Sequence, residues 1–203
     1  MNISATILAA GSSSRMGRDN KLLLPVHGQP IINHVCNAVM KSKIKKVVVV
    51  TGYQHSQIEE ILPETIDNVM YNEQWGNGMA SSISLGISSL PSTIDGNMVI
   101  LGDMPLLTAE IIDMIFDKFL ENKGQKIVYP IWRDVQCNPV IFPKKYFSEI
   151  RSLRGDQGCK VLIEKSLDST IGVHVNSSEV SFDCDTMDDY SVLISNDLKY
   201  VET

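Results

Sequence analysis

The sequence predicts a single α/β domain in three layers, with a mostly parallel sheet between two layers of helices. Its 203 residues suit one domain that is long enough to bury a full core. A content of 43% hydrophobic and 21% charged residues is typical of a globular chain. Short apolar runs rich in Val and Ile alternate with segments of helical period, which is typical of parallel strands buried on both faces.

The first two thirds of the chain contain the clearest elements. The apolar runs predict strands over residues 6–9, 46–51, 69–71, 98–101 and 127–129. Pro30 suits the first turn of a helix over residues 30–40. A second helix is predicted after Thr108, a residue type favoured at the N-cap, because residues 111–120 carry one apolar stripe at helical spacing. Both helices fit crossovers between parallel strands.

After Pro130 the alternation is less regular. The pattern predicts a strand over residues 138–142, helices near 143–151 and 157–166, and a strand near 170–175. No internal repeat or Gly/Ser linker interrupts the chain, so we expect one domain over residues 1–203. Ligands of open parallel sheets bind beyond the carboxyl ends of the strands. The segments that follow strands are therefore the candidates for a functional site.

Composition excludes several classes of protein. The net charge of −6 argues against a general nucleic-acid binder. No apolar run is long enough to span a membrane, and residues 1–10 do not have the form of a secretory signal, so we expect a cytoplasmic protein without a membrane partner. The four cysteines form no C-x-x-C pair, which argues against a zinc or thioredoxin-type site and favours reduced thiols.

Positive charge is concentrated in residues 1–50, where seven Lys and Arg stand against one acid. This distribution suits a small polyphosphate held by the first part of the chain and a metal held by the acidic remainder. Four of these cations, Lys41, Lys43, Lys45 and Lys46, are better explained as a solvated turn before a strand.

The segment after the first predicted strand, residues 8–17, is rich in Gly, Ser and Arg. Backbone N–H groups and hydroxyls in such a loop can surround a polyphosphate, and Arg15 and Lys21 can add charge. It is not a Walker A loop, because Met16 stands where the second glycine is required, and not a dinucleotide fingerprint, because Ser12 and Ser13 follow Gly11. A hydride-transferring dehydrogenase is therefore disfavoured. An ordinary turn is the competing interpretation.

Two groups of acidic residues occur later in the chain than this loop. Asp103 stands immediately after a predicted buried strand, next to Gly102, which would let a ligand approach the backbone. The second group is Asp183, Asp185, Asp188 and Asp189. Mg²⁺ prefers one or two carboxylates together with phosphate oxygens and water, so one acid from each group could meet at a triphosphate. A turn or helix cap is the alternative for Asp103, and the acidic first turn of a terminal helix is the preferred interpretation of Asp183, Asp188 and Asp189.

Leu8-Ala-Ala-Gly-x-Ser-x-Arg-Met-Gly17, followed by Lys21-Leu-Leu, resembles the signature loop of the molybdenum cofactor cytidylyltransferases. The related guanylyltransferases usually have L-A-G-G at its start. The resemblance continues in order over nearly the whole chain, through Asn72-x-x-Trp75-x-x-Gly78-Met79-x-x-Ser82, Leu101-Gly-Asp-Met-Pro105, Asn138-Pro-Val-x-Phe142, Gly155-Asp-x-Gly158 and Asp183-x-Asp-Thr-x-x-Asp189-Tyr190. Each piece is weak alone, but their joint order and spacing make a strong match.

The resemblance implies a Rossmann-like nucleotidyltransferase fold with a nucleotide-binding half at 1–110 and an acceptor-binding half at 111–203. It implies transfer of CMP from CTP to a molybdopterin-type cofactor, with release of pyrophosphate, for a xanthine dehydrogenase-type molybdoenzyme. The implied catalytic residues are Arg15, Lys21, Asp103 and Asp185, the last two as ligands of Mg²⁺ or Mn²⁺. The implied nucleotide-binding residues are Leu8, Ala9, Ala10, Gly11, Ser12, Ser13, Arg15, Lys21, Gly52, Gly78, Met79, Ser82, Gly102 and Asp103. The implied acceptor-binding residues are Asn138, Pro139, Gly155, Asp156 and Gly158.

The sequence departs from the family at Cys137, where glycine is usual before Asn-Pro, and at Cys159, where alanine is usual. A thiol is a soft ligand, but a small buried cysteine in place of another small residue is the preferred interpretation.

Ala10 stands where guanylyltransferases have glycine, so its methyl group should favour cytosine over a purine. We also expect the backbone groups of residues 8–10 to be free to read a base. Three alternatives are a GTP-using guanylyltransferase, a sugar-1-phosphate nucleotidyltransferase, which shares the opening loop, and a cofactor carrier without catalysis. The joint presence of Arg15, Lys21, Asp103 and Asp185 favours an enzyme over a carrier.

Overall fold

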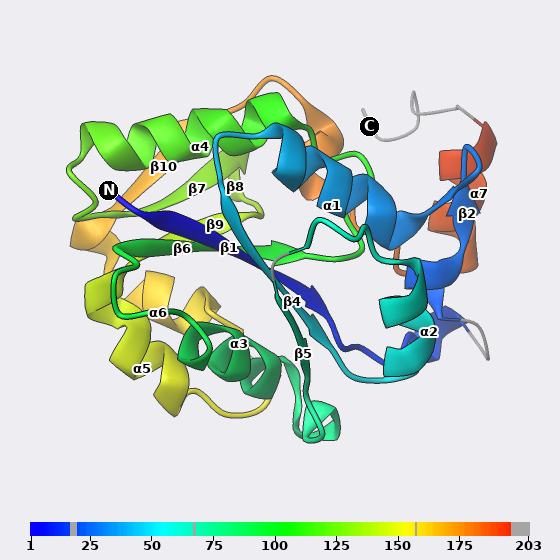
Figure 1. Ribbon diagram of the computed structural model, residues 1–203. Coiled ribbons are helices and arrows are strands. Elements are labelled where there is room, and N and C mark those ends of the chain that lie inside the picture. Colours follow the sequence, from blue (N-terminus) through cyan, green and yellow to red (C-terminus); the bar gives the residue numbers. More distant parts are fainter. Residues whose placement is uncertain (17–19, 67, 157, 196–203) are drawn as a thin grey trace.

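The computed structural model describes residues 1–16, 20–66, 68–156 and 158–195. Within these residues, eight strands form one central sheet in the order β10-β7-β9-β6-β1-β4-β5, with β8 paired to β7 (Figure 1). Their bounds are β1 Ile3–Ala9, β4 Lys46–Thr51, β5 Asn68–Tyr71, β6 Gly96–Leu101, β7 Ile127–Trp132, β8 Val135–Gln136, β9 Val140–Pro143 and β10 Thr170–His174. The sheet is parallel except for β8 and β9, which confirms the predicted class.

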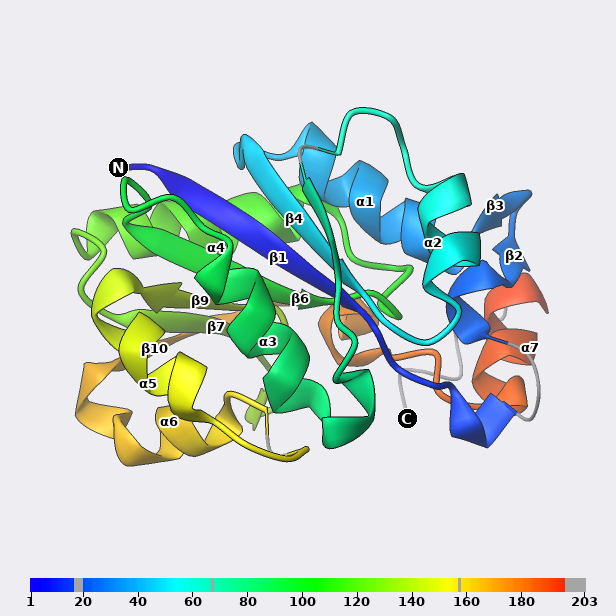
Figure 2. The same ribbon diagram turned by 60° about the horizontal axis from the view of Figure 1, so that its bottom comes forward.

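Helices cover both faces of this sheet. Helices α1 and α4 lie on one face, α3, α5 and α6 lie on the other, and α2 and α7 lie at the end toward which β1 points (Figures 1 and 2). The bounds are α1 Ile31–Lys41, α2 His55–Ile61, α3 Met79–Ser88, α4 Ala109–Glu121, α5 Phe147–Ser152, α6 Lys160–Lys165 and α7 Met187–Ser195. Short 3-10 turns occur at Ser14–Met16, Lys21–Leu23, Trp75–Asn77, Lys144–Tyr146, Leu167–Ser169 and Ser178–Ser181, and β2 Pro25–Val26 pairs with β3 Gln29–Pro30.

The strands are buried on both faces, as their unbroken apolar runs predict. In β6, Met98 and Ile100 belong to the core under α1 and α4, whereas Val99 belongs to the core under α3 and α5. In β9, Ile141 belongs to the first core and Phe142 to the second. None of the described helices has the length and apolar character that crossing a membrane requires.

Two strands begin earlier than predicted because a buried polar pair interrupts their apolar pattern. Asn97 donates from Nδ2 to Oγ of Ser4 at 2.8 Å, and both residues are fully buried. This bond lets polar side chains enter the core without an unsatisfied donor, so β1 begins at Ile3 and β6 at Gly96.

Later elements differ from their predicted bounds by a few residues. The strand predicted over 138–142 begins at Val140, and the helix predicted near 143–151 is a 3-10 turn followed by α5. The helix predicted near 157–166 is the shorter α6. Two helices, α2 and α3, were not predicted. The sequence HSQIEEI of α2 is short and mostly polar, and the sequence MASSISLGIS of α3 contains four serines and a glycine, which are weak helix formers.

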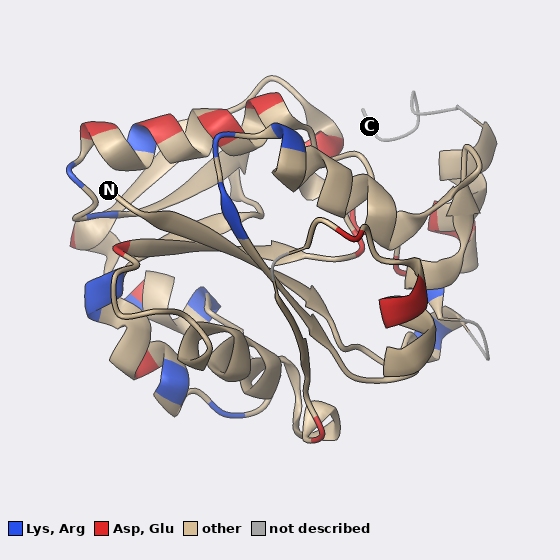
Figure 3. Cartoon of the chain, viewed as in Figure 1, with Lys and Arg blue, Asp and Glu red and all other residues tan. Residues whose placement is uncertain are grey.

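The lysines predicted to form a solvated turn between α1 and β4 are all exposed. Lys43 pairs with Asp117 on α4, with 2.6 Å between Nζ and Oδ2 and about half of each side chain exposed. Figure 3 shows this positive turn beside the acids of α4, on the layer formed by α1 and α4. An exposed pair of this kind contributes little to stability, about 0 to 1 kcal/mol.

Thr108 caps α4 as predicted, because its side chain accepts a hydrogen bond from the N–H of Ile111. Replacing Thr108 with alanine should lower the free energy of unfolding by about 0.5 to 2 kcal/mol, since one amide at the helix end loses its acceptor. Urea denaturation measures this change. Thr108→Ser, which keeps the hydroxyl, is the matched control and should lose less. Equal losses in the two variants would contradict a capping role.

Candidate active site

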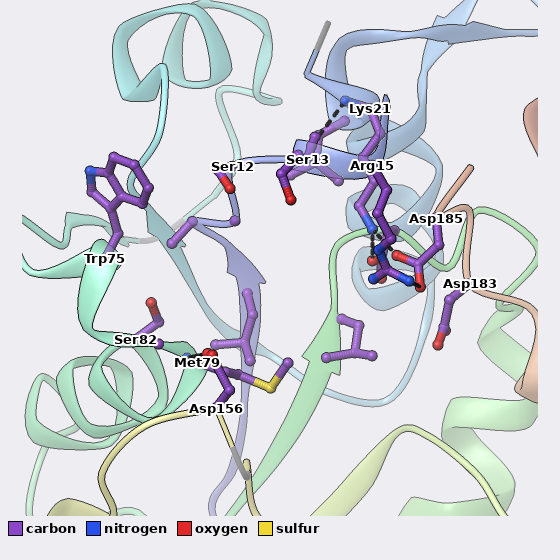
Figure 4. A pocket seen from close by; sticks show the side chains of 18 of the residues that line it. Ser12, Ser13, Arg15, Lys21, Trp75, Met79, Ser82, Asp156, Asp183 and Asp185 are labelled. Atoms are coloured by element: carbon purple, nitrogen blue, oxygen red, sulfur yellow. Dashed lines mark hydrogen bonds and ion pairs between the residues drawn. The ribbon is translucent and has the colours of Figure 1, made fainter. Parts of the chain in front are cut away.

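Two cavities adjoin the sheet, and the larger of them lies where the sequence predicted, beyond the carboxyl ends of β1 and β6. The larger cavity has a volume of about 540 Å³ and extends from the loop at residues 10–15 to the beginning of α3 (Figure 4). The smaller cavity, of about 340 Å³, lies between α3, β9 and α6. Both cavities are lined by Met79, Leu101 and Asp156, so they adjoin.

The loop after β1 is held in shape by its own polar side chains. Ser13 has a left-handed backbone, with φ of 52°, and its carbonyl accepts from the N–H of Met16 at 2.8 Å. The Ser13 hydroxyl accepts from the N–H of Lys21 at 3.1 Å, and the buried Asn20 accepts from Leu22 at 3.1 Å. Asn20 is therefore a structural residue of the loop that sequence reasoning missed. Gly17, the last residue of the signature loop, lies outside the described residues.

Four charged side chains meet at one end of the larger cavity. The Lys21 ammonium lies between Asp103 and Asp185, donating to a carboxylate oxygen of Asp103 and, at 2.6 Å, to Oδ1 of Asp185. The Arg15 guanidinium pairs with Oδ2 of Asp185 at 2.9 Å. Only 13% of the Lys21 side chain and 16% of that of Asp103 are exposed. The structure thus brings together the four residues that the resemblance implies are catalytic.

The charges in this cluster shift the pKa values of its members. Burial lowers the pKa of Lys21, but the carboxylates of Asp103 and Asp185 outweigh burial and raise that pKa above its ordinary value. Burial first, and then repulsion from Asp103 and Asp185, raises the pKa of Asp183 to about 7. Asp183 also lines the larger cavity, although its sequence context predicts a place in the first turn of a helix.

Asp185 reaches Asp103 because the chain returns to β6 shortly before α7. The N–H of Cys184 donates to the carbonyl of Asp103 at 2.9 Å. Asp189 then accepts from the N–H groups of Asp185 and Thr186 at 3.0 and 2.7 Å, while Thr186 accepts from the N–H of Asp189 at 3.2 Å. This reciprocal cap confirms that Asp189 belongs to the first turn of a terminal helix.

The opposite end of the larger cavity is formed by the turn before α3 and the helix's first residues. Trp75, Gly78, Met79 and Ser82 line it. Ser82 is buried and its hydroxyl accepts from Nδ2 of Asn72 at 2.9 Å. Trp75 and Ser82 lie across the cavity from Arg15 and Asp185 in Figure 4.

Most of the implied nucleotide-binding residues line the larger cavity, and three do not. Those that line it are Leu8, Ala10, Gly11, Ser12, Ser13, Arg15, Lys21, Gly78, Met79, Ser82 and Asp103. Ala9, Gly52 and Gly102 are not among its lining residues. A side chain at Gly102 would lie 2.7 Å from the carbonyl of Leu8, so this glycine allows close packing between strands rather than the approach of a ligand.

The expectation of free backbone groups at residues 8–10 is wrong for two carbonyls. The carbonyl of Leu8 accepts from the N–H of Gly102 at 2.9 Å, and that of Ala10 accepts from Tyr53 at 3.1 Å. Neighbouring segments at the sheet edge use these acceptors to complete the fold. Ala10 is nonetheless one of the residues that line the larger cavity.

The smaller cavity is lined by three of the five implied acceptor-binding residues, Asn138, Asp156 and Gly158. Pro139 and Gly155 do not line it. Gly155 instead accepts from the N–H of Ala80 at 3.0 Å, and Asp156 accepts from the N–H of Met79 at 3.1 Å, so this loop caps the N-terminus of α3.

Cys137 and Cys159 both line the smaller cavity. Cys137 is 7% exposed, and Cys159 packs against the core under α3 and α5. Burial raises the pKa of the Cys159 thiol to about 12, and burial also raises that of Cys137. Both side chains are therefore protonated thiols at neutral pH, which agrees with their interpretation as small packing residues.

The sequence of residues 5–170 matches a family described as the MobA-like NTP transferase domain. The chain belongs to this family. The match confirms the resemblance at the level of the nucleotidyltransferases, and it supports an enzyme of that class. Asp183 and Asp185 lie beyond the matched residues of the MobA-like domain.

Curated relatives of this MobA-like domain are longer proteins. Bifunctional protein GlmU of Clostridioides difficile (strain 630) is 32% identical over 170 residues, which are 83% of this chain and 35% of that protein. The protein of the same name from Shouchella clausii is 35% identical over 125 residues, 61% of this chain and 27% of that protein. The chain spans about a third of the length of these relatives.

Solved structures share the fold of the MobA-like domain from end to end. A nucleotidyl transferase from Methanothermobacter thermautotroptrophicus superposes with a TM-score of 0.82 at 23% identity, over 98% of both chains. The homologue of Mycobacterium tuberculosis Rv0371c from Mycobacterium sp. strain JC1 gives a TM-score of 0.84, also at 23% identity and over 98% of both chains. The predicted nucleotidyltransferase fold is thereby confirmed.

The acids of the larger cavity suit a divalent cation that also binds phosphate. Asp103 and Asp185 offer the hard carboxylate oxygens that Mg²⁺ and Mn²⁺ prefer. Oδ1 of Asp103 is buried and has no hydrogen-bond partner within the described part of the chain. Three or more His, Cys, Asp or Glu side chains nowhere converge to hold a metal among the described residues. The carboxylates of Asp103 and Asp185 therefore fit a divalent cation.

Proposed function

We propose that this chain is a nucleotidyltransferase that transfers CMP from CTP to a molybdopterin-type molybdenum cofactor and releases pyrophosphate. Its product would serve the maturation of a xanthine dehydrogenase-type molybdoenzyme. The observation that carries the proposal is the pair of adjoining cavities, which share Met79, Leu101 and Asp156. A transferase must bring two substrates into contact, and the two cavities provide adjoining places for them.

In this proposal residues 1–110 supply most of the nucleotide cavity and residues 111–203 supply most of the acceptor cavity. Arg15 and Lys21 lie where they can exchange the carboxylates of Asp103 and Asp185 for the β- and γ-phosphates of the nucleotide. Mg²⁺ or Mn²⁺ held by Asp103 and Asp185 would supply positive charge to the phosphate oxygens.

The protein's part in this reaction is to position the two substrates and to balance the charge on the phosphates. A terminal phosphate oxygen of the acceptor attacks the α-phosphorus of CTP in line, the bond from that phosphorus to the pyrophosphate oxygen breaks, and pyrophosphate leaves. Arg15 and Lys21 balance the charge of the leaving group. No side-chain nucleophile is needed, because a phosphate monoester is already ionised at neutral pH.

Pyrophosphate release tests the proposal. Purified protein with CTP, the reduced molybdopterin-type acceptor and Mg²⁺ should release pyrophosphate only when both substrates are present. Release with GTP in preference to CTP would favour the guanylyltransferase alternative. Binding of the acceptor without release from any nucleotide would favour a carrier and overturn the enzyme assignment.

Ala10→Gly tests the proposed choice of base. Ala10 is 6% exposed and lines the larger cavity, so its methyl group limits the space for a base. One methyl group in a packed pocket discriminates by about 1 to 3 kcal/mol. The variant should therefore narrow the CTP to GTP ratio of kcat/KM by about tenfold without reversing it, because Met79 and Ser82 are unchanged. An equal loss with both nucleotides would show that the loop senses phosphate geometry instead.

A further inference from the structure

Resting on the proposed function, we propose that Trp75 is the surface on which the nucleotide base stacks, and that Tyr53 and Gly52 fix its position. No motif considered above gives Trp75 this role. The inference comes from where its ring lies in the larger cavity and from the segments that hold it there.

The first step is the direction in which a nucleotide must lie. The cations that can bind its phosphates, Arg15 and Lys21, are at one end of the larger cavity, together with Asp103 and Asp185. Trp75 stands on the far side of the cavity from this cluster, near Ser12 and above Ser82 and Met79 (Figure 4). A triphosphate bound by the charged cluster therefore places its base toward Trp75.

The second step is the chemistry of the wall at that end. Trp75 is the sole aromatic side chain among the described residues that line the larger cavity. Apart from Met79, the other residues that line the cavity at this end are small, namely Ala10, Gly76, Gly78 and Ser82. Small residues leave room for a flat ring, and an indole face supplies the stacking surface that every nucleobase can use.

The third step is the rigidity of the indole. The ring of Trp75 meets the ring of Tyr53 edge to face, with centroids 5.6 Å apart and planes inclined by 61°. A side chain at Gly52 would lie 2.6 Å from Cβ of Trp75, so only glycine lets this turn pack against the end of β4. The backbone N–H of Trp75 donates to Asn72 at 3.2 Å. Tyr53 thus fixes the ring, while Gly52 and Asn72 fix the Cβ and the backbone from which it extends, so the partly buried side chain is in position before a ligand binds.

This assignment gives nucleotide affinity and the choice of base to different residues. Stacking tolerates any base, because all bases have a π-face. Trp75 should therefore strengthen the binding of both CTP and GTP, whereas Ala10 and Ser82 should set most of the preference between them. Substitutions of Trp75 and of Ala10 should therefore differ in how far they change the ratio of the affinities for CTP and GTP.

Intrinsic fluorescence tests the contact directly, because the chain has two tryptophans. Trp132 lines neither cavity and lies under the guanidinium of Arg133 at 4.5 Å. In Trp132→Phe, where Trp75 is the remaining fluorophore, CTP with Mg²⁺ should quench the emission. In Trp75→Phe, the matched control, the same titration should leave the emission of Trp132 unchanged.

Calorimetric titration of the same variants completes the test. Trp75→Ala should bind both CTP and GTP roughly tenfold to a hundredfold more weakly, and Trp75→Phe should lose much less, because a phenyl ring still stacks. If wild-type protein binds CTP but Trp132→Phe shows no quenching, the inference fails and the proposed function stands, even if Trp75→Ala does not fold. A loss of affinity in Trp75→Ala that is confined to one of the two nucleotides would also overturn it. If CTP, GTP and ATP all fail to bind wild-type protein, the proposed function itself fails.

Discussion

Asp103→Asn is expected to lower the rate of nucleotidyl transfer by about a hundredfold or more while leaving the fold intact. The amide has the shape of the carboxylate but lacks the charge that would hold the cation and that now holds Lys21. Steady-state release of pyrophosphate at saturating Mg²⁺ measures the effect, and circular dichroism checks the fold. Turnover close to that of the wild type would contradict the proposed role of this residue.

The double variant Asp103→Asn, Asp185→Asn sharpens this result. If both carboxylates hold one cation, the double variant should be little worse than the more damaged single variant, because one ion can be lost only once. Fully additive losses would mean that Asp103 and Asp185 act independently. Asp117→Asn, which changes a half-exposed acid of α4, is the control and should keep wild-type turnover.

Lys21→Ala is expected to change the affinities for nucleotide and for free metal in opposite directions. The ammonium of Lys21 now lies between Asp103 and Asp185, so its removal leaves both carboxylates without this positively charged partner. Free Mn²⁺ should therefore bind more tightly to the variant, by electron paramagnetic resonance. CTP should bind roughly tenfold to a hundredfold more weakly, because a charge-assisted hydrogen bond to phosphate is lost, whereas CMP should change little.

The control for this prediction is Lys41→Ala, which removes an exposed lysine outside both cavities and should alter neither affinity beyond a small, salt-sensitive effect. Equal weakening of CTP and CMP in Lys21→Ala would place Lys21 at the base or ribose. Weaker binding of Mn²⁺ would show that Lys21 supports the cation site instead of occupying it.

The sheet was predictable because its strands are buried on both faces. Runs such as KVVVVT at β4 have no competing interpretation at this length, and the bounds of β4 were predicted correctly. The starts of β1 and β6 were missed because the buried pair of Ser4 and Asn97 looks polar in the sequence and is satisfied only in three dimensions. The start of α3 was also hidden in the sequence, because its cap comes from Gly155 and Asp156, which are distant along the chain.

The charged end of the site was more predictable than the rest of it. Arg15, Lys21, Asp103 and Asp185 stand next to strand ends or in acidic runs, and residue type together with the resemblance selects them. The role of Asn20 depends on hydrogen bonds within its own loop, and the position of Asp183 depends on where the chain returns before α7. The packing of Gly102 against Leu8 likewise depends on neighbouring strands. No local pattern encodes these contacts.

The hydrogen bond between the N–H of Cys184 and the carbonyl of Asp103 joins distant parts of the chain, which affects the order in which the structure can form. Lys21 and Asp185 are 164 positions apart, so the charged cluster closes a long loop of the chain. Such distant contacts form late, because the entropy of closing the loop must be overcome first. A nascent chain on the ribosome can assemble β1, β4 and β6 well before Asp185 has been added. The two carboxylates can therefore come together only after the chain has been extended beyond Asp185.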